Sequence, residues 1–165
     1  MFNLASFDFW PFKNNSAKFF NSKLHDETTF YQAFIKDLKN CRKEIIIESP
    51  FISCRRMAAL EPIFKALIKR KIKIYIVTRH PGEQDNLMKE QAEAKIYDFE
   101  MIGVHVIISP GYHHRKLAIL DRKILWEGSL NILSQSTSRE IMRRIDGTKP
   151  SSEMFKFLKL GNYIY

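Results

Sequence analysis

The chain has 165 residues, of which 45% are hydrophobic and 27% are charged, as expected for a single soluble globular domain rather than a disordered one. Its net charge of +9 favours a polyanionic partner such as nucleic acid or an anionic surface, unless the surplus is merely spread over solvated helix faces. Two cysteines, Cys41 and Cys54, do not make a disulfide framework, and no long apolar run predicts a membrane span, so a cytoplasmic protein is expected.

Residues 1–24 are predicted to form an irregular leader, rich in phenylalanine and asparagine. Asp8, Pro11 and Lys13 interrupt it, so it lacks the basic start and continuous apolar stretch of a signal peptide. The leader could pack as an arm on this subunit or on a partner, or it could mark a domain boundary. Residues 25–165 are predicted to form one domain.

Hydrophobic periodicity predicts alternating helices and strands from residue 26 onward. Phe30, Phe34 and Leu38 recur at helical spacing, whereas Glu44-Ile-Ile-Ile-Glu48 is a β-branched run that ends at Ser49-Pro50. In chain order we expect a helix over 26–41, a strand over 44–48, a helix over 55–70, a strand over 72–77, a helix over 84–102, strands over 104–109, 114–120, 123–127 and 139–145, and a last helix from residue 150. This order predicts an α/β fold with a mixed central β-sheet flanked by helices.

The stretch His114-Arg-Lys-Leu-Ala-Ile-Leu-Asp121 carries the most chemical information. In a strand over 114–120, His114 and Lys116 point to the same face, because strand side chains alternate. That face offers an imidazole beside a fixed positive charge. Asp121 falls at the end of the strand, where a turn begins.

This pair of side chains suits phosphodiester cleavage without a metal or a cofactor. A neutral imidazole can attack phosphorus to form a covalent intermediate, and Lys116 can neutralise the charge on the phosphoryl oxygens. Ser129 and Asn131, two residues apart in Gly128-Ser-Leu-Asn131, can donate further hydrogen bonds to the same phosphate from one side of an extended segment. Glu140 is the candidate carboxylate that orients the imidazole of His114.

The pattern His-x-Lys-x-x-x-x-Asp followed by Gly-Ser-x-Asn resembles the signature of the phospholipase D superfamily. The string GSLNILSQSTSREIM is most similar to its endonuclease and helicase-associated branch. The resemblance covers at least residues 44–145 and implies an α/β/α sandwich. It also implies that His114 is the nucleophile, that Lys116 and Asn131 bind phosphate with support from Ser129, and that Glu140 orients His114. Asp121 is expected to be more structural than chemical.

The superfamily's active site needs two such motifs, and this sequence contains one. The resemblance therefore implies a homodimer in which two motifs meet at a two-fold axis. One His114 must then be neutral while the other is protonated, so that the two imidazoles titrate as a coupled pair.

Several neighbouring residues have two interpretations. His113 is expected to be a substrate-side or surface histidine, and Glu48 either a surface turn residue or a wall of the site. Arg139, Arg143 and Arg144 could follow a phosphate backbone or line a solvated strand edge.

The favoured function is hydrolysis of DNA or RNA phosphodiesters through phosphohistidine. A phospholipid phosphodiesterase is one alternative, since the motif recognises the phosphodiester rather than the alcohols around it. The other is a non-catalytic nucleic-acid-binding module of a helicase or restriction system.

Overall fold

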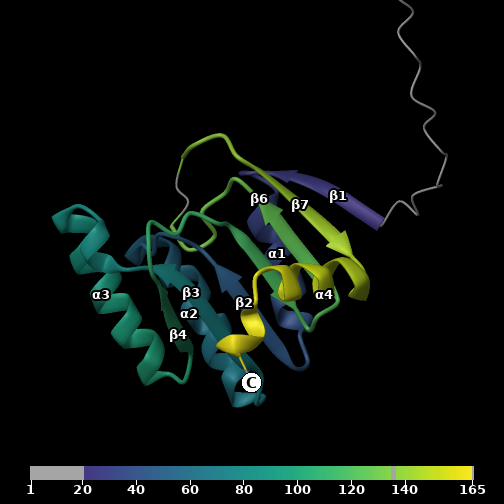
Figure 1. Ribbon diagram of the computed structural model, residues 1–165, viewed down its shortest axis with the longest axis horizontal. Helices are drawn as coiled ribbons and strands as arrows, with labels where there is room; N and C mark the ends of the chain where they lie inside the picture. The colour runs from purple at the N-terminus through teal and green to yellow at the C-terminus, as the bar shows by residue number, and fades with distance from the viewer. Residues whose placement is uncertain (1–20, 135–136, 165) are drawn as a thin grey trace, which may run out of the picture.

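The computed structural model describes residues 21–134 and 137–164. These residues form a seven-stranded sheet with helices packed against it, in the strand order β1-β7-β6-β5-β2-β3-β4 (Figure 1). Strands β2, β3 and β4 run parallel to one another, and the other neighbouring strands pair in antiparallel fashion. The predicted α/β fold with a mixed central sheet is confirmed.

The elements follow the predicted order with small shifts of their ends. They are β1 (Asn21–Asp26), α1 (Phe30–Asn40), β2 (Glu44–Glu48), α2 (Cys54–Lys69), β3 (Lys73–Arg79), η1 (Pro81–Glu83), α3 (Asn86–Met101), β4 (His105–Ser109), β5 (Leu117–Leu120), β6 (Ile124–Gly128), β7 (Ile141–Asp146), α4 (Thr148–Phe157) and η2 (Leu160–Asn162). None of the helices in this described part of the chain is both long enough and apolar enough to cross a bilayer.

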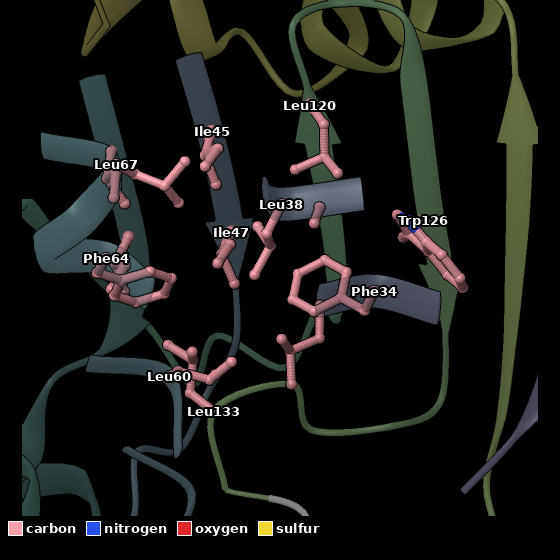
Figure 2. Packing of buried hydrophobic residues seen from close by; sticks show 14 of the residues in the cluster. Phe34, Leu38, Ile45, Ile47, Leu60, Phe64, Leu67, Leu120, Trp126 and Leu133 are labelled. Carbon is pink, nitrogen blue, oxygen red and sulfur yellow. The ribbon is translucent and has the colours of Figure 1, made fainter. Parts of the chain in front are cut away.

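The central strands of the sheet are buried on both faces, and the alternation of side chains along β2 shows how. Ile45 and Ile47 point into the larger hydrophobic cluster, which α1 and α2 complete on one face of the sheet. Phe34 and Trp126 lie side by side in this cluster (Figure 2), with their ring centroids 5.9 Å apart. Ile46 points the opposite way, into a smaller cluster that includes Leu158 from the C-terminal segment after α4.

Two predicted boundaries are wrong. Residues 21–24, assigned to the leader, belong to β1, which pairs with β7 at one edge of the sheet. The sequence of β1 shows no clean alternation, so pairing with its neighbour rather than local pattern makes it a strand; residues 1–20 of the leader lie outside the described residues. The strand predicted over 114–120 begins only at Leu117.

Five strands begin or end along one edge of the sheet, which is the edge that runs across the strands and not the edge formed by an outer strand such as β1. The carboxyl ends of the parallel strands β2 and β3 lie there, and β5 starts beside them because Glu48 pairs with Leu117. The end of β6 and the start of β7 join them, since Gly128 pairs with Met142. Ligands of α/β sheets commonly bind at such an edge.

Candidate active site

His114 and Lys116 lie together at this edge, in the irregular segment that leads into β5. Lys116 Nζ is 2.8 Å from His114 Nδ1 and donates a hydrogen bond of 2.9 Å to the carbonyl oxygen of His114. The expected pairing of the two side chains is therefore present, although no regular strand produces it. A charged ammonium can only donate a hydrogen bond. When Lys116 is charged and His114 is neutral, Nδ1 of His114 therefore accepts from Nζ of Lys116.

The surroundings of this pair favour the neutral imidazole. Desolvation lowers the pKa of His114, and the positive charges of Lys116 and Arg79 lower it further. Desolvation also lowers the pKa of Lys116, while the negative charge of Glu140 acts in the opposite direction. A neutral histidine next to an ammonium group is the arrangement that a nucleophile facing an anionic phosphate requires.

Ser129 lies beside the pair, directly after the end of β6. Together with His114 and Lys116 it lines an open cavity of about 690 Å³. Its hydroxyl accepts a hydrogen bond of 3.1 Å from the amide of Ile141 at the start of β7. Gly128 makes this approach possible, because a Cβ there would collide with the carbonyl oxygen of Ile141.

Asn131 lines a different hollow from Ser129, and binding of one phosphate by both side chains stays a prediction. No regular strand continues past Gly128, and Asn131 lines a separate hollow with Phe51 and Ser53. Phe51 connects this hollow to the catalytic pair, since its ring centroid is 6.1 Å from that of His114. The amide oxygen Oδ1 of Asn131 is buried and accepts no hydrogen bond from residues 21–134 or 137–164, which is unusual for a group with no function.

Glu140 lies just before β7, and its carboxylate accepts a hydrogen bond of 3.0 Å from the hydroxyl of Ser138. Its charge is felt at Lys116 rather than at His114. Among the interactions of the described residues, no hydrogen bond joins this carboxylate to the imidazole, and an orienting role of Glu140 toward His114 stays a prediction. Lys116 occupies Nδ1 instead.

Asp121 lies at the opposite end of β5 from the catalytic pair. Its carboxylate accepts three backbone hydrogen bonds of 2.8 to 3.0 Å from the amides of Arg42, Lys43 and Glu44, in the turn that leads into β2. This placement agrees with a structural rather than a chemical role and separates Asp121 from the other candidate residues.

A buried charged cluster lies beneath the catalytic pair, and the prediction of His113 as a surface residue is wrong. Glu48 is completely buried at the end of β2, and its Oε2 atom is 2.6 Å from Nε of Arg115. His113 is only 6% exposed, and its Nε2 atom is 3.9 Å from the same carboxylate oxygen. The guanidinium of Arg115 reaches the buried carboxylate although half of its side chain remains exposed, and the polar character of His113 gave no signal of its burial.

Burial controls the protonation of this cluster. Desolvation raises the pKa of Glu48, and the ion pair with Arg115 acts against that rise. Desolvation, followed by the positive charge of Arg115, lowers the pKa of His113 to about 4. His113 is therefore neutral at physiological pH, and its burial keeps the imidazole away from a substrate in solution.

Three arginines of β7 and the preceding loop behave differently from one another. Arg143 lines the 690 Å³ cavity. Arg144 forms a 2.7 Å ion pair with Asp37 within the fold, and Arg139 is exposed.

Within residues 21–134 and 137–164, no group of three histidine, cysteine or acidic side chains is placed to hold a metal ion.

Comparisons with known proteins agree with this architecture. The family model described as the PLD-like domain of cardiolipin synthase matches residues 34–158. Among solved structures, NucT from Helicobacter pylori is similar at 19% identity and a TM-score of 0.69, over 85% of this chain and 94% of that one. Nuc from Salmonella typhimurium, a phospholipase D family member, is similar at 16% identity and a TM-score of 0.68, over 84% of this chain and 91% of the other.

A phosphatidylserine synthase from Haemophilus influenzae shares the fold at 11% identity and a TM-score of 0.60, over 86% of this chain but 38% of that larger one. No curated protein matches the sequence significantly. At these identities the solved structures show a common fold, and the family model spans well over half of the chain. The chain belongs to the family of phospholipase D-like domains.

Proposed function

We propose that this protein is a metal-independent phosphodiesterase that hydrolyses nucleic acid through a phosphohistidine formed on His114. The observation that carries the proposal is the 2.8 Å contact between Lys116 Nζ and His114 Nδ1 at the mouth of an open cavity. The lowered pKa of His114 keeps the imidazole neutral and therefore nucleophilic. The net charge of +9 attracts a polyanion, and two similar folds belong to proteins named Nuc and NucT.

In the proposed reaction Lys116 moves its hydrogen bond from the imidazole of His114 to the phosphate, the freed lone pair of the imidazole attacks phosphorus, and the bond between phosphorus and the leaving oxygen breaks. The leaving oxygen takes a proton from a protonated His114 of a second copy of the chain. Water then attacks the phosphohistidine and gives its proton to that second imidazole, and the phosphorus–nitrogen bond breaks. Lys116 and Ser129 stabilise the phosphoryl oxygens in both steps.

The second copy is part of the proposal because this chain supplies one such histidine and lysine pair. The cavity that holds His114 is bordered on its other side by apolar side chains from β1, β7 and α4, namely Leu24, Ile141 and Phe157. Their exposures are 58%, 58% and 81%. Large apolar side chains gathered beside an incomplete site fit an interface between two copies around a two-fold axis.

Cleavage of single-stranded DNA, plasmid DNA and RNA in excess EDTA tests the proposal, with wild type compared with His114→Ala. His105→Ala is the matched control, because His105 is an exposed histidine on β4 at the far edge of the sheet. We expect wild type and His105→Ala to cleave and His114→Ala to be inactive. Equal cleavage by wild type and His114→Ala, or dependence on added metal, would contradict the proposal.

The same apolar border favours phospholipid as a second candidate substrate, since Leu24, Ile141 and Phe157 could contact an acyl chain. Release of the head group from phospholipid vesicles, together with intact nucleic acids, would select this reaction. Salt-sensitive binding of nucleic acid that survives His114→Ala, with no cleavage of either substrate by wild type, would instead indicate a non-catalytic binding module.

A further inference from the structure

A row of stacked side chains leads outward from His114. The ring of Phe51 meets that of His114 edge to face, and the guanidinium of Arg79, at the end of β3, lies 5.8 Å from the centroid of Phe51. On its other side, the same guanidinium lies 4.9 Å from the ring centroid of Tyr112. Tyr112 is two residues before His114 and is 75% exposed. The row therefore ends in an aromatic ring that is backed on one face and open to solvent.

Glu83 of η1 holds both outer members of this row in place. Its carboxylate accepts hydrogen bonds of 3.0 Å from Nε of Arg79 and from the backbone amide of Tyr112. Tyr112 has a φ of 47°, a left-handed conformation that is costly for a residue with a bulky side chain. A strained and exposed tyrosine, whose backbone amide is held by the same carboxylate that pairs with Arg79, indicates that the position of the ring matters for function.

The open face of Tyr112 suits a flat, neutral, aromatic group. Arg79 covers the opposite face, and its charge would repel a second cation, so a quaternary ammonium head group is disfavoured. A nucleobase is a flat ring of the required kind, and base–aromatic stacking is the usual device of proteins that bind single strands. Duplex bases are already stacked and paired, and they cannot reach such a ring without unwinding.

We propose that Tyr112, supported by Arg79 and Glu83, is a subsite for an unpaired nucleobase beside the phosphate that His114 attacks. This inference rests on the proposed action on nucleic acid and narrows it to single strands. Tyr112 precedes His114 by two residues, and Arg79 is close enough for its charge to be felt at the imidazole. A base on Tyr112 would thus place its own phosphate next to the nucleophile.

Equilibrium binding tests the subsite without requiring cleavage. Fluorescence anisotropy would compare a labelled oligothymidylate with an abasic strand of equal length, using the His114→Ala protein to prevent turnover. We expect Tyr112→Ala to weaken binding of the intact strand about tenfold and to leave binding of the abasic strand unchanged. Tyr112→Leu, which keeps an apolar side chain, should show the same loss, whereas Tyr112→Phe should not.

Tyr97→Ala is the matched control, since Tyr97 is an exposed tyrosine (63%) in the second half of α3. Intact-strand affinity that is unchanged in both Tyr112→Ala and Tyr112→Leu would overturn the subsite, and so would an equal loss on the abasic strand. Wild type that cleaves with no dependence on Tyr112 would reject the subsite and keep the proposed function. Base-dependent binding through Tyr112 without cleavage would keep the subsite and reject the proposed function.

Discussion

The two ends of β5 carry groups of similar polarity that are put to different uses. At the Asp121 end, a carboxylate accepts three backbone hydrogen bonds, and Arg122 forms an ion pair with Glu44. At the His114 end, Lys116 lies against an imidazole, and the Oδ1 atom of Asn131 has no hydrogen-bond partner in the described part of the chain. Polar groups that hydrogen-bond or form ion pairs with one another stabilise a fold. Polar groups without such a partner, or next to a group of the same charge, are available to bind a substrate.

Replacing Lys116 should give the largest effect and should change activity alone. Lys116→Ala removes the ammonium that we propose binds the phosphoryl oxygens, so we expect a loss in kcat/KM of about a hundredfold or more. The urea unfolding midpoint should change little, because the side chain supports no buried structure beyond its contact with His114. Steady-state kinetics measures kcat/KM, and urea unfolding of the same preparation measures the unfolding midpoint. A large loss of stability would place Lys116 among the structural residues.

Replacing His113 should change the pH dependence of stability. Its pKa of about 4 in the folded state lies below the ordinary value of 6.5, so between these two pH values the unfolded chain binds a proton that the folded chain does not. Stability should therefore fall by roughly 3 kcal/mol as the pH drops through this window. In His113→Leu this part of the fall should disappear.

Urea melts from neutral pH to about pH 4 would measure the effect of His113→Leu. His105→Leu, at an exposed histidine, shows what the loss of a histidine does by itself. A wild-type curve and a His113→Leu curve that stay parallel through the window would contradict the buried, neutral state assigned to His113.

Asp121→Ala should lower stability and leave the chemistry of the folded protein intact. It removes the acceptor of three amide hydrogen bonds at the turn into β2, which we expect to cost about 2 kcal/mol. Thermal or urea unfolding measures the loss, and kcat at a temperature where the variant is folded should match wild type. A fall in kcat of the kind expected for Lys116→Ala would show that the two ends of β5 are not separate in function.

The smallest effect is expected from Arg122→Ala at the same structural end. The guanidinium lies 3.3 Å from the ring centroid of Phe155 and pairs with Glu44, both partly exposed contacts. We expect a loss of about 1 kcal/mol, measured by urea unfolding, with unchanged kcat. A loss as large as that of Asp121→Ala would mean that this outer contact contributes as much as the network around Asp121.

Hydrophobic pattern was enough to predict most of the fold. The isoleucines of β2 and the helical spacing of Phe30, Phe34 and Leu38 are local signals, and both elements are where the spacing predicts them. Strand β1 was missed, because its polar sequence becomes a strand only through pairing with β7.

The candidate site was predicted less completely than the fold. Motif spacing indicated His114, Lys116 and Ser129, which the structure brings to one cavity. It did not indicate Arg79 or Tyr112, because their stacking depends on a contact between the end of β3 and the segment that precedes β5. The burial of Glu48 and His113 was equally hidden, since a charged residue at the end of a strand normally indicates exposure.

Trapping of the covalent intermediate would test most directly whether His114 is the nucleophile. Wild type would be mixed with single-stranded oligonucleotide in excess EDTA and quenched in alkali, which preserves phosphohistidine, and its peptides would be analysed by mass spectrometry. We predict a phosphoryl-nucleotide adduct on His114 that is absent from Lys116→Ala at the same reaction time. Rapid cleavage with no adduct on His114, or an adduct on His113 instead, would contradict it.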